Sequence, residues 1–296
     1  MRVEAAQHSN IRTWASLAVA VSGAMWGCFW LPLRWISDQG LGGSWVSAVF
    51  FLVAALTPLP FLLRRAAWQG FASQLLTGTL LGLAFSLYTV SLVLTEVINA
   101  ILLFYLTPVW STLAGVFLLG ERLTLRRALA IGLGFCGMAF ILGFEHGIPM
   151  PRNTGDWLAL VSGMIWAAGT MRSFHKPGRG IALPFFAFSV GGLAASLVIV
   201  LVALGAGSDS AAAANPAMAL PWAVVMALIF FVPPNFLVLW AAQRIDSGRV
   251  GILLMTEVLM GAVTAALFSG EPFGMMQIAG TACIAAAALI EVMNHR

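Results

Sequence analysis

The sequence predicts an all-α integral membrane protein with ten transmembrane helices, arranged as two inverted five-helix repeats. Three observations lead to this fold class. Hydrophobic residues make up 60% of the 296-residue chain and charged residues only 9%, and apolar runs of helical length recur along its whole extent. Soluble proteins carry roughly 25% charged residues. Because so few charges cannot cover a soluble surface, most of this chain must face lipid or other buried helices.

Charged or turn residues bound each of ten apolar runs. A bilayer span needs about 20 apolar residues, and the connections left between ten spans are too short to form a domain outside the membrane. The first run is too long for the apolar part of a secretory signal, and we expect it to remain as the first span. The predicted spans are 14–35, 44–63, 71–93, 98–118, 125–143, 156–174, 181–204, 220–241, 249–268 and 274–292.

The basic residues predict an orientation. With ten spans, thirteen of the 15 Lys and Arg residues fall on the side of the N-terminus, and only Arg34 and Arg152 fall on the other side. Cytoplasmic loops carry an excess of Lys and Arg, so both termini are predicted to be cytoplasmic, in the inner membrane. Since the charges mark membrane boundaries, no nucleic-acid partner is expected. The expected partners are the lipid bilayer and a small-molecule substrate, and we expect a monomer.

The scarce polar residues exclude several enzyme classes. Lys176, the single lysine, does not lie in a phosphate-binding G-x-x-x-x-G-K-[ST] loop, which excludes a self-contained ATPase. The histidines and aspartates, Asp38 and Asp156 among them, are expected in loops or tails, where they cannot form an intramembrane catalytic pair. The three cysteines stand singly, without metal-ligand spacing. We therefore predict no catalytic residue, no metal site and no cofactor.

The two halves of the chain resemble each other. The stretch SGAMWG at 22–27 is similar to SGMIWA at 162–167, and LLGER at 118–122 is similar to FSGEP at 268–272. Five spans are an odd number, so the second half must cross the membrane in the opposite sense. Inverted repeats are typical of alternating-access transporters, whose substrate site lies near the midplane between the repeats. The predicted divisions are a cytoplasmic tail 1–13, repeats 14–143 and 156–292, an external linker 144–155 and a cytoplasmic tail 293–296.

The fourth span of each half carries a family pattern. The stretch from Leu106-Thr107-Pro108-Val109 through Gly120-Glu121-Arg122-Leu123 resembles the repeat of the drug/metabolite transporter superfamily, in particular its ten-span EamA-type exporters. In the second half the similar stretch runs from Thr256-Glu257-Val258 through Gly270-Glu271-Pro272. Val258 stands where the family often has proline, so the pattern does not predict a matching kink in this span.

The resemblance implies a function as well as a fold. Within the superfamily the chain most resembles the YddG-type exporters of aromatic amino acids, which implies secondary transport of neutral, often bulky amino acids out of the cytoplasm. Two alternatives stay open: export of drugs or other metabolites, and, in a different class, a passive solute channel. Sugar phosphates are disfavoured because no span carries a Lys or Arg at its centre.

Glu257 is the sharpest candidate for a functional residue. It lies eight residues after Arg249, so at 1.5 Å per residue it is about 12 Å inside the cytoplasmic boundary. A carboxylate at that depth is costly and is by default a functional-site hypothesis. Three roles stay open: binding a substrate ammonium group, carrying a coupling proton, or capping the backbone of a neighbouring helix.

The middle of the eighth span contains Pro233, Pro234 and Asn235. Two prolines remove two backbone donors and kink or break a helix. Broken helices at membrane depth are tolerated where protein or a water-filled cavity satisfies the freed carbonyls. Asn235 either hydrogen-bonds a substrate or satisfies the backbone of a hinge.

Deep aromatic residues complete the candidate site. Such side chains can pack an apolar group of a substrate, and tyrosine hydroxyls can fix its orientation. Two further prolines are interpreted as kinks, and two Gly-x-x-x-Gly pairs, at 23–27 and 78–82, predict close helix packing. The aromatic candidates are Trp26, Trp30, Phe85, Tyr88, Tyr105 and Trp166, and the additional kink prolines are Pro32 and Pro108.

Overall fold

The described part of the chain forms helices and no β-strand. A computed structural model describes residues 2–63, 68–119, 124–142, 150–176, 180–205, 216–242, 244–245, 247–270 and 274–294. Glu121, Asp246 and Glu271, the linker up to residue 149 and the last two residues of the C-terminal tail lie outside these ranges. The described helices are α1 (Arg2–Gly27), α2 (Trp30–Asp38), α3 (Gly43–Leu56), η1 (Leu59–Leu62), α4 (Phe71–Leu94), α5 (Val97–Phe104), α6 (Thr107–Leu119), α7 (Leu125–Leu142), α8 (Thr154–His175), α9 (Ala182–Gly205), α10 (Pro216–Met226), η4 (Ala227–Phe231), α11 (Val232–Ala242), α12 (Ser247–Phe268) and α13 (Met275–Asn294).

Each predicted apolar run coincides with one helix or with an interrupted helix. Five described segments are long and apolar enough to cross a membrane: Ile11–Asp38, Phe71–Leu94, Val97–Phe117, Ala182–Gly205 and Ala217–Ala241. Four further apolar helices are shorter. These segments support a multi-pass membrane protein, while the count of ten spans remains a prediction.

Four of the predicted runs are interrupted, and proline lies at or near each interruption. The second run divides at Thr57 and Pro58 into α3 and η1. The first run divides at Cys28 and Phe29 into α1 and α2, and the fourth divides at Tyr105 and Leu106 into α5 and α6. The eighth run passes from α10 through η4, a short π-helical turn, into α11. Since proline lacks the amide hydrogen that a helix interior requires, these sequences favour a break over a continuous helix.

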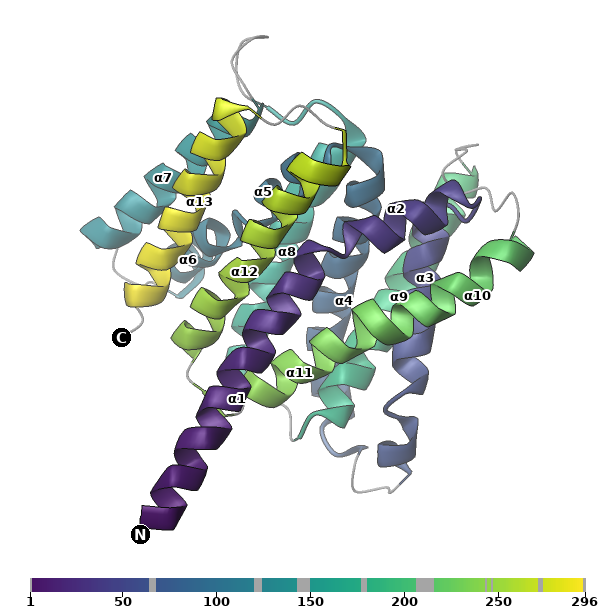
Figure 1. The fold of residues 1–296 in the computed structure, drawn as a ribbon, viewed down its shortest axis with the longest axis horizontal. Coiled ribbons are helices and arrows are strands. Elements are labelled where there is room, and N and C mark those ends of the chain that lie inside the picture. The colour runs from purple at the N-terminus through teal and green to yellow at the C-terminus, as the bar shows by residue number, and fades with distance from the viewer. Residues whose placement is uncertain are drawn as a thin grey trace.

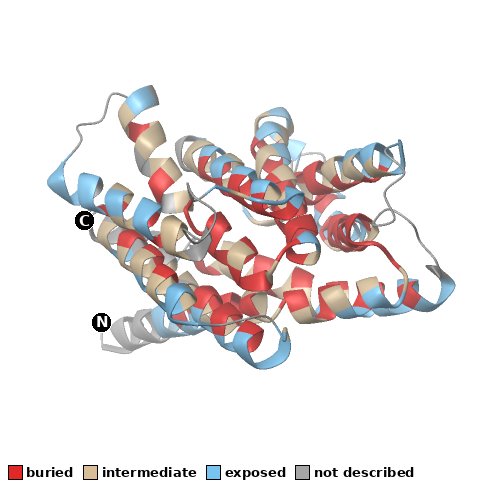
Figure 2. Ribbon diagram, turned by 90° about the horizontal axis from the view of Figure 1, so that it is seen from above, coloured by how far each residue is buried: buried red, intermediate tan, exposed pale blue. Residues whose placement is uncertain are grey.

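Helices that are distant in the sequence pack side by side. In Figure 1, α1 lies along α12 in the middle of the molecule, and α7 lies along α13 at one edge. The α4 helix packs on both α8 and α9, and α8 also packs on α5 and α6. Buried residues gather toward the middle of this arrangement and exposed ones toward its periphery (Figure 2).

Small residues permit the closest of these contacts, as the Gly-x-x-x-Gly pairs predict. A Cβ atom on Gly82 of α4 would lie 2.6 Å from the carbonyl oxygen of Phe188 on α9. A Cβ atom on Gly27 of α1 would lie 2.7 Å from the amide nitrogen of Gly261 on α12. Because both distances are shorter than a van der Waals contact, the helices could not approach so closely with larger residues at these positions.

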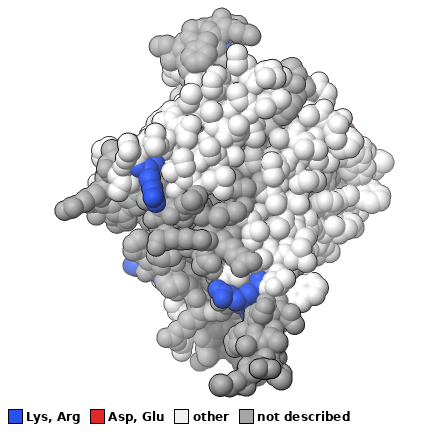
Figure 3. All heavy atoms as spheres, turned by 60° about the vertical axis from the view of Figure 1, so that its left-hand side comes forward, with Lys and Arg blue, Asp and Glu red and all other residues white. Residues whose placement is uncertain are grey.

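The outer surface is largely apolar. Exposed large side chains include Trp14, Phe61, Leu201 and Leu267. On the face in Figure 3, the described residues are almost all uncharged, and Lys and Arg occur only at isolated points. Soluble proteins rarely expose apolar surface so continuously. Lipid is the environment that suits this surface.

The prediction that the aspartates lie in loops is wrong for Asp156, and Asp38 is the last residue of α2. Asp156 is buried in the first turn of α8 because Asn153 caps that helix, its side-chain oxygen accepting the Asp156 amide hydrogen at 2.8 Å. The Asp156 carboxylate accepts hydrogen bonds from the Thr95 hydroxyl at 2.6 Å and from the Arg152 amide at 3.0 Å. Asp156 therefore ties the start of α8 to the end of α4.

Candidate functional site

The buried carboxylate of Glu257 is bonded to a tyrosine from another helix. Glu257 lies on α12 and is 5% exposed. The Tyr105 hydroxyl donates a hydrogen bond to its Oε2 atom at 2.6 Å, and the Leu254 carbonyl lies 3.3 Å from the same hydroxyl. Tyr88 of α4 also lies near enough to interact with this carboxylate. The whole chain contains two tyrosines, and both converge on Glu257.

The interruption between α5 and α6 positions Tyr105. Pro108, the second residue of α6, has no amide hydrogen to donate to the Phe104 carbonyl. The Thr107 hydroxyl instead donates to that carbonyl at 2.7 Å. Tyr105 thus lies where the backbone leaves α5, and from there its side chain reaches α12. The kink predicted from Pro108 is an interruption that begins before the proline.

Phe85 is the centre of a buried aromatic cluster that we call the aromatic core. Its ring centroid lies 6.4 Å from that of Trp26, 6.1 Å from that of Tyr88 and 6.4 Å from that of Trp166. Phe104 extends the cluster, stacking on Tyr88 at 4.5 Å and contacting Trp166 at 5.8 Å and Tyr105 at 5.8 Å. The aromatic core is made of Trp26, Phe29, Trp30, Phe51, Phe85, Tyr88, Phe104, Tyr105, Trp166, Phe188 and Phe231.

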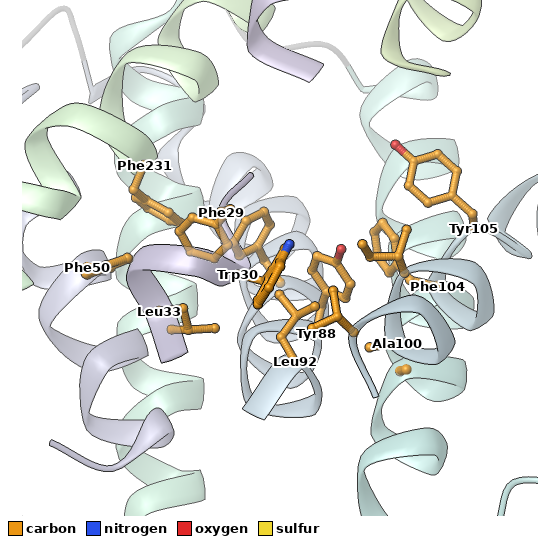
Figure 4. Packing of buried hydrophobic residues seen from close by; sticks show 14 of the residues in the cluster. Phe29, Trp30, Leu33, Phe50, Tyr88, Leu92, Ala100, Phe104, Tyr105 and Phe231 are labelled. Carbon is orange, nitrogen blue, oxygen red and sulfur yellow. The ribbon is translucent and has the colours of Figure 1, made fainter. Parts of the chain in front are cut away.

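Trp30 lies at the edge of the aromatic core, where Figure 4 shows its indole beside Tyr88. The indole Nε1 atom donates to the Thr264 hydroxyl of α12 at 3.0 Å. On its other side, the Arg34 guanidinium lies 5.5 Å from the Trp30 ring centroid. Of the predicted aromatic candidates, Trp30, Phe85, Tyr88 and Tyr105 are buried, while Trp26 and Trp166 are half-buried.

Asn235 is turned toward its own backbone. Its side-chain nitrogen donates to the Phe231 carbonyl at 2.7 Å. Phe231 ends the π-helical turn η4 two residues before Pro233, where the regular pattern of backbone hydrogen bonds is disturbed. Of the two roles predicted for Asn235, this geometry favours the hinge. The ring of Phe231, 5.3 Å from Phe85, connects that hinge to the aromatic core.

A cavity of about 360 Å³ opens at one end of the molecule, away from the Glu257 carboxylate. The ends of α2 and α4 line it, and its charged residues are Arg34, Asp38 and Glu96. The Arg34 guanidinium donates to the Leu92 and Thr95 carbonyls at 2.9 and 2.7 Å, which caps the C-terminal end of α4. This end corresponds to the predicted external face. Among the described residues, no group of three or more His, Cys, Asp or Glu side chains could hold a metal ion.

The site also contains residues that are not among the sequence candidates, and Phe104, Phe231 and Thr264 make contacts that matter for the arguments below. Phe104 directly precedes Tyr105, and Phe231 lies two residues before Pro233, so both lie close to candidate residues. Thr264 follows Glu257 by seven residues, which is two helical turns and places both on one face of α12. That spacing was the available signal for Thr264.

Comparisons with known proteins agree with the membrane character of the fold. The model of the EamA-like transporter family matches residues 13–143 and again residues 153–293. An uncharacterized transporter of Archaeoglobus fulgidus is 29% identical over 266 residues, covering 85% of this chain and 88% of the relative. An uncharacterized transporter of Methanothermobacter thermautotrophicus is 29% identical over 189 residues, covering 62% of this chain. The chain spans about half the length of this second relative, 53%.

Among solved structures, one crystal structure of a protein superposes on this chain with a TM-score of 0.60. The superposition covers 93% of this chain and 95% of the other, at 18% sequence identity. At that identity the likeness concerns the fold alone. The fold is therefore one that an experimentally determined structure shares along nearly its whole length.

Proposed function

The chain belongs to the EamA-like transporter family, and from this premise we propose that it is a secondary transporter that exports small amphipathic metabolites from the cytoplasm. The substrates we propose are amino acids, aromatic ones included. The observation that carries this proposal is the buried contact between Tyr105 and Glu257, which joins α12 to the α5–α6 interruption inside the aromatic core. The family is one of transporters, which also supports a function other than catalysis.

We propose ten spans in two inverted repeats, both termini cytoplasmic, in the inner membrane. The helix contacts support this arrangement because they occur in matching pairs. If each span is exchanged for its counterpart in the other half, the contact of α1 with α12 becomes the contact of α8 with α5 and α6. The contact of α4 with α8 likewise becomes that of α11 with α1, and α7 with α13 maps onto itself.

The aromatic core supports an aromatic amino acid as substrate. Its rings meet mostly edge to face, and a substrate ring can replace such contacts at little cost when the cluster opens. The Glu257 carboxylate, next to Tyr88 and Tyr105, is the group in this cluster that can bind a substrate ammonium. It can equally take up a proton, which makes protons the proposed coupling ion.

Alternating access requires that the packed core opens toward one side at a time. The described structure has the aromatic core closed around Phe85, and its cavity of about 360 Å³ lies at the predicted external end. We propose that substrate passes between these two places. A passive channel, the alternative from a different class, requires a continuous polar path, whereas polar groups in this core occur at separate points.

The experiment is counterflow of labelled phenylalanine into proteoliposomes that contain the full chain, in competition with a panel of amino acids and drugs. A carrier accumulates label transiently against unlabelled substrate inside, and a channel does not. We expect aromatic amino acids to compete best. Accumulation that drugs reduce at lower concentrations than amino acids do would support the exporter of drugs or other metabolites instead, and absence of counterflow would contradict the proposal.

The role of Glu257 is tested by Glu257→Gln, with transport measured across pH. If the carboxyl carries the coupling proton, the variant should lose at least tenfold in rate and lose the pH dependence of the parent. Glu4→Gln, a carboxylate change near the start of α1 and ahead of the predicted first span, is the matched control and should keep the parent profile. An unchanged pH profile in Glu257→Gln contradicts proton coupling through this residue.

Competition by 3-phenylpropionate separates ammonium binding from proton carriage. This compound keeps the ring and the carboxylate of phenylalanine but lacks its amine. If Glu257 binds the ammonium, Glu257→Gln should weaken competition by phenylalanine by about tenfold, as expected for a charge-assisted hydrogen bond. Competition by 3-phenylpropionate should then stay at the parent level. Equal weakening of both compounds excludes a direct contact with the amine.

A further inference from the structure

The backbone between α1 and α2 leaves the Gly27 carbonyl without its helical donor. The Leu31 amide, which in a continuous helix would donate to the Gly27 carbonyl, donates to the Cys28 carbonyl at 3.1 Å. The Phe29 amide likewise bonds three residues back, to Trp26 at 3.0 Å. This tightening directly precedes Pro32, whose nitrogen carries no hydrogen. The Gly27 carbonyl therefore needs a donor from outside its own helix.

Thr264 of α12 reaches that carbonyl. Its hydroxyl oxygen lies 3.2 Å from the Gly27 carbonyl oxygen, and 2.7 and 3.2 Å from the Met260 and Gly261 carbonyl oxygens of its own helix, so these three acceptors share its single hydrogen. The same hydroxyl accepts the indole hydrogen of Trp30 at 3.0 Å. One side chain, 5% exposed, thus touches both sides of the interruption: the last residue of α1 and the first residue of α2.

Close packing makes the contact possible. A Cβ atom on Gly27 would lie 2.5 Å from the Glu257 carbonyl oxygen, so α1 and α12 meet backbone to backbone at this level. Thr256 makes a similar bond nearer the start of α12, to the Ala20 carbonyl at 2.9 Å. That carbonyl lies within the regular part of α1, where the helix supplies a donor. Two threonines of α12 therefore contact α1, and one of them lies within hydrogen-bond distance of a carbonyl that the interruption has freed.

We propose that Thr264 is a positioning residue that holds the interruption between α1 and α2 closed and fixes the indole of Trp30 in the aromatic core. In this role it ties a hinge of the first half of the chain to a helix of the second half. Its effect on transport rests on the proposed function, because the hinge matters for transport only if the two halves move against each other. Its effect on the hinge itself does not.

The test uses Cys28, which lies in the interruption and is partly exposed. In a Cys136→Ser, Cys283→Ser background, this residue is the remaining thiol of the chain. Its rate of labelling by a maleimide in proteoliposomes reports how often the interruption opens, whether or not the protein transports anything. We expect Thr264→Val to raise the labelling rate by about two- to tenfold, the range for loss of one buried hydrogen bond.

Two variants separate the bond from the packing. Thr264→Ser keeps the hydroxyl and should restore the labelling rate of the parent. Thr256→Val makes the same chemical change on the same pair of helices, at a carbonyl that keeps its helical donor, and should leave Cys28 labelling unchanged. Labelling of Thr264→Val at the parent rate would overturn the proposal. An equal increase in Thr256→Val would overturn it as well, because the effect would then be general loosening of the α1–α12 contact.

Trp30→Phe keeps the proposal testable if Thr264→Val does not fold. This variant retains an aromatic ring but removes the indole donor, so Thr264 loses one of the two contacts by which it spans the interruption. We expect a smaller rise in Cys28 labelling than with Thr264→Val, and a parent-like rate would contradict the proposed role of the Trp30 bond.

Counterflow measured in parallel should show a lower maximal rate for Thr264→Val, restored in Thr264→Ser. If counterflow is absent from the parent while Cys28 labelling follows the prediction, the proposed function fails and the hinge assignment stands.

Discussion

The α5–α6 pair and α12 occupy corresponding places in the two segments that match the family, but only one of them is broken. The first carries Thr107-Pro108 and is interrupted at Tyr105 and Leu106. The second carries Glu257-Val258 and is a continuous helix of 22 residues. Val258 supplies the amide hydrogen that proline lacks, so the ladder of helical hydrogen bonds continues through it.

This difference gives the two helical segments complementary roles. At the interruption between α5 and α6 the backbone leaves the helical path, and the Tyr105 side chain reaches α12. On the continuous helix α12 the Glu257 carboxylate lies on a regular helix face, where it accepts a hydrogen bond from the Tyr105 hydroxyl at 2.6 Å. The two corresponding helices thus do not perform the same role: one half supplies the donor and the other supplies the acceptor of a single buried hydrogen bond.

Interrupting α12 as well should have the largest effect on both stability and transport. Val258 is fully buried in that helix, and Val258→Pro removes one backbone hydrogen bond and brings a ring against the preceding turn. We expect a loss of about 3 kcal/mol or more in the free energy of unfolding, together with loss of counterflow. The measurement is thermal unfolding in detergent.

Val258→Ala is the matched control for that variant, because it removes side-chain volume and keeps the amide hydrogen. It should cost less than the proline variant and keep transport. If Val258→Pro unfolds at the temperature of the parent, continuity of α12 is not what holds Glu257 in place.

A smaller effect is expected where α8 crosses the broken helix. A Cβ atom on Gly163 would lie 2.7 Å from the Phe104 carbonyl oxygen, which is backbone and cannot move without shifting α5. We expect Gly163→Ala to cost about 1–3 kcal/mol in the free energy of unfolding, as overpacked sites do. Gly132→Ala on α7, where nothing lies within 4 Å of the added atom, should be neutral or stabilising. Equal melting temperatures for the two variants would show that the crossing is looser than described.

Much of the fold could be predicted from the sequence because a backbone in lipid must satisfy its own hydrogen bonds, which favours helices. Apolar runs of the right length had to become helices, and each predicted run is one helix or an interrupted one. Pro32, Pro108 and the pair Pro233 and Pro234 indicate three of the interruptions for a local reason, the missing amide hydrogen. The position of Asp156 inside α8 depends on the capping of that helix by Asn153, three residues ahead of it, and not on the apolar pattern.

The residues of the candidate site could largely be predicted from the sequence, but the contacts between them could not. Glu257 stood out because a carboxylate deep in a span is costly, and the two tyrosines were visible as rare polar aromatics. Their meeting depends on helices separated by about 150 positions in sequence, 152 for Tyr105 and Glu257, which no local pattern specifies. The bond of Thr264 to the Gly27 carbonyl depends on the crossing of α1 and α12, so it too required the structure.

A double-mutant cycle tests most directly whether the hydrogen bond between Tyr105 and Glu257 is needed for transport. Counterflow rates are measured for the parent, Tyr105→Phe, Glu257→Gln and the double variant, with Tyr105→Phe combined with Gly132→Ala as the unlinked pair. If the two groups act as one unit, the double variant should be no slower than the slower single variant, a coupling of about 1–3 kcal/mol. Independent losses that multiply in the double variant, as expected for the unlinked pair, would contradict the claim.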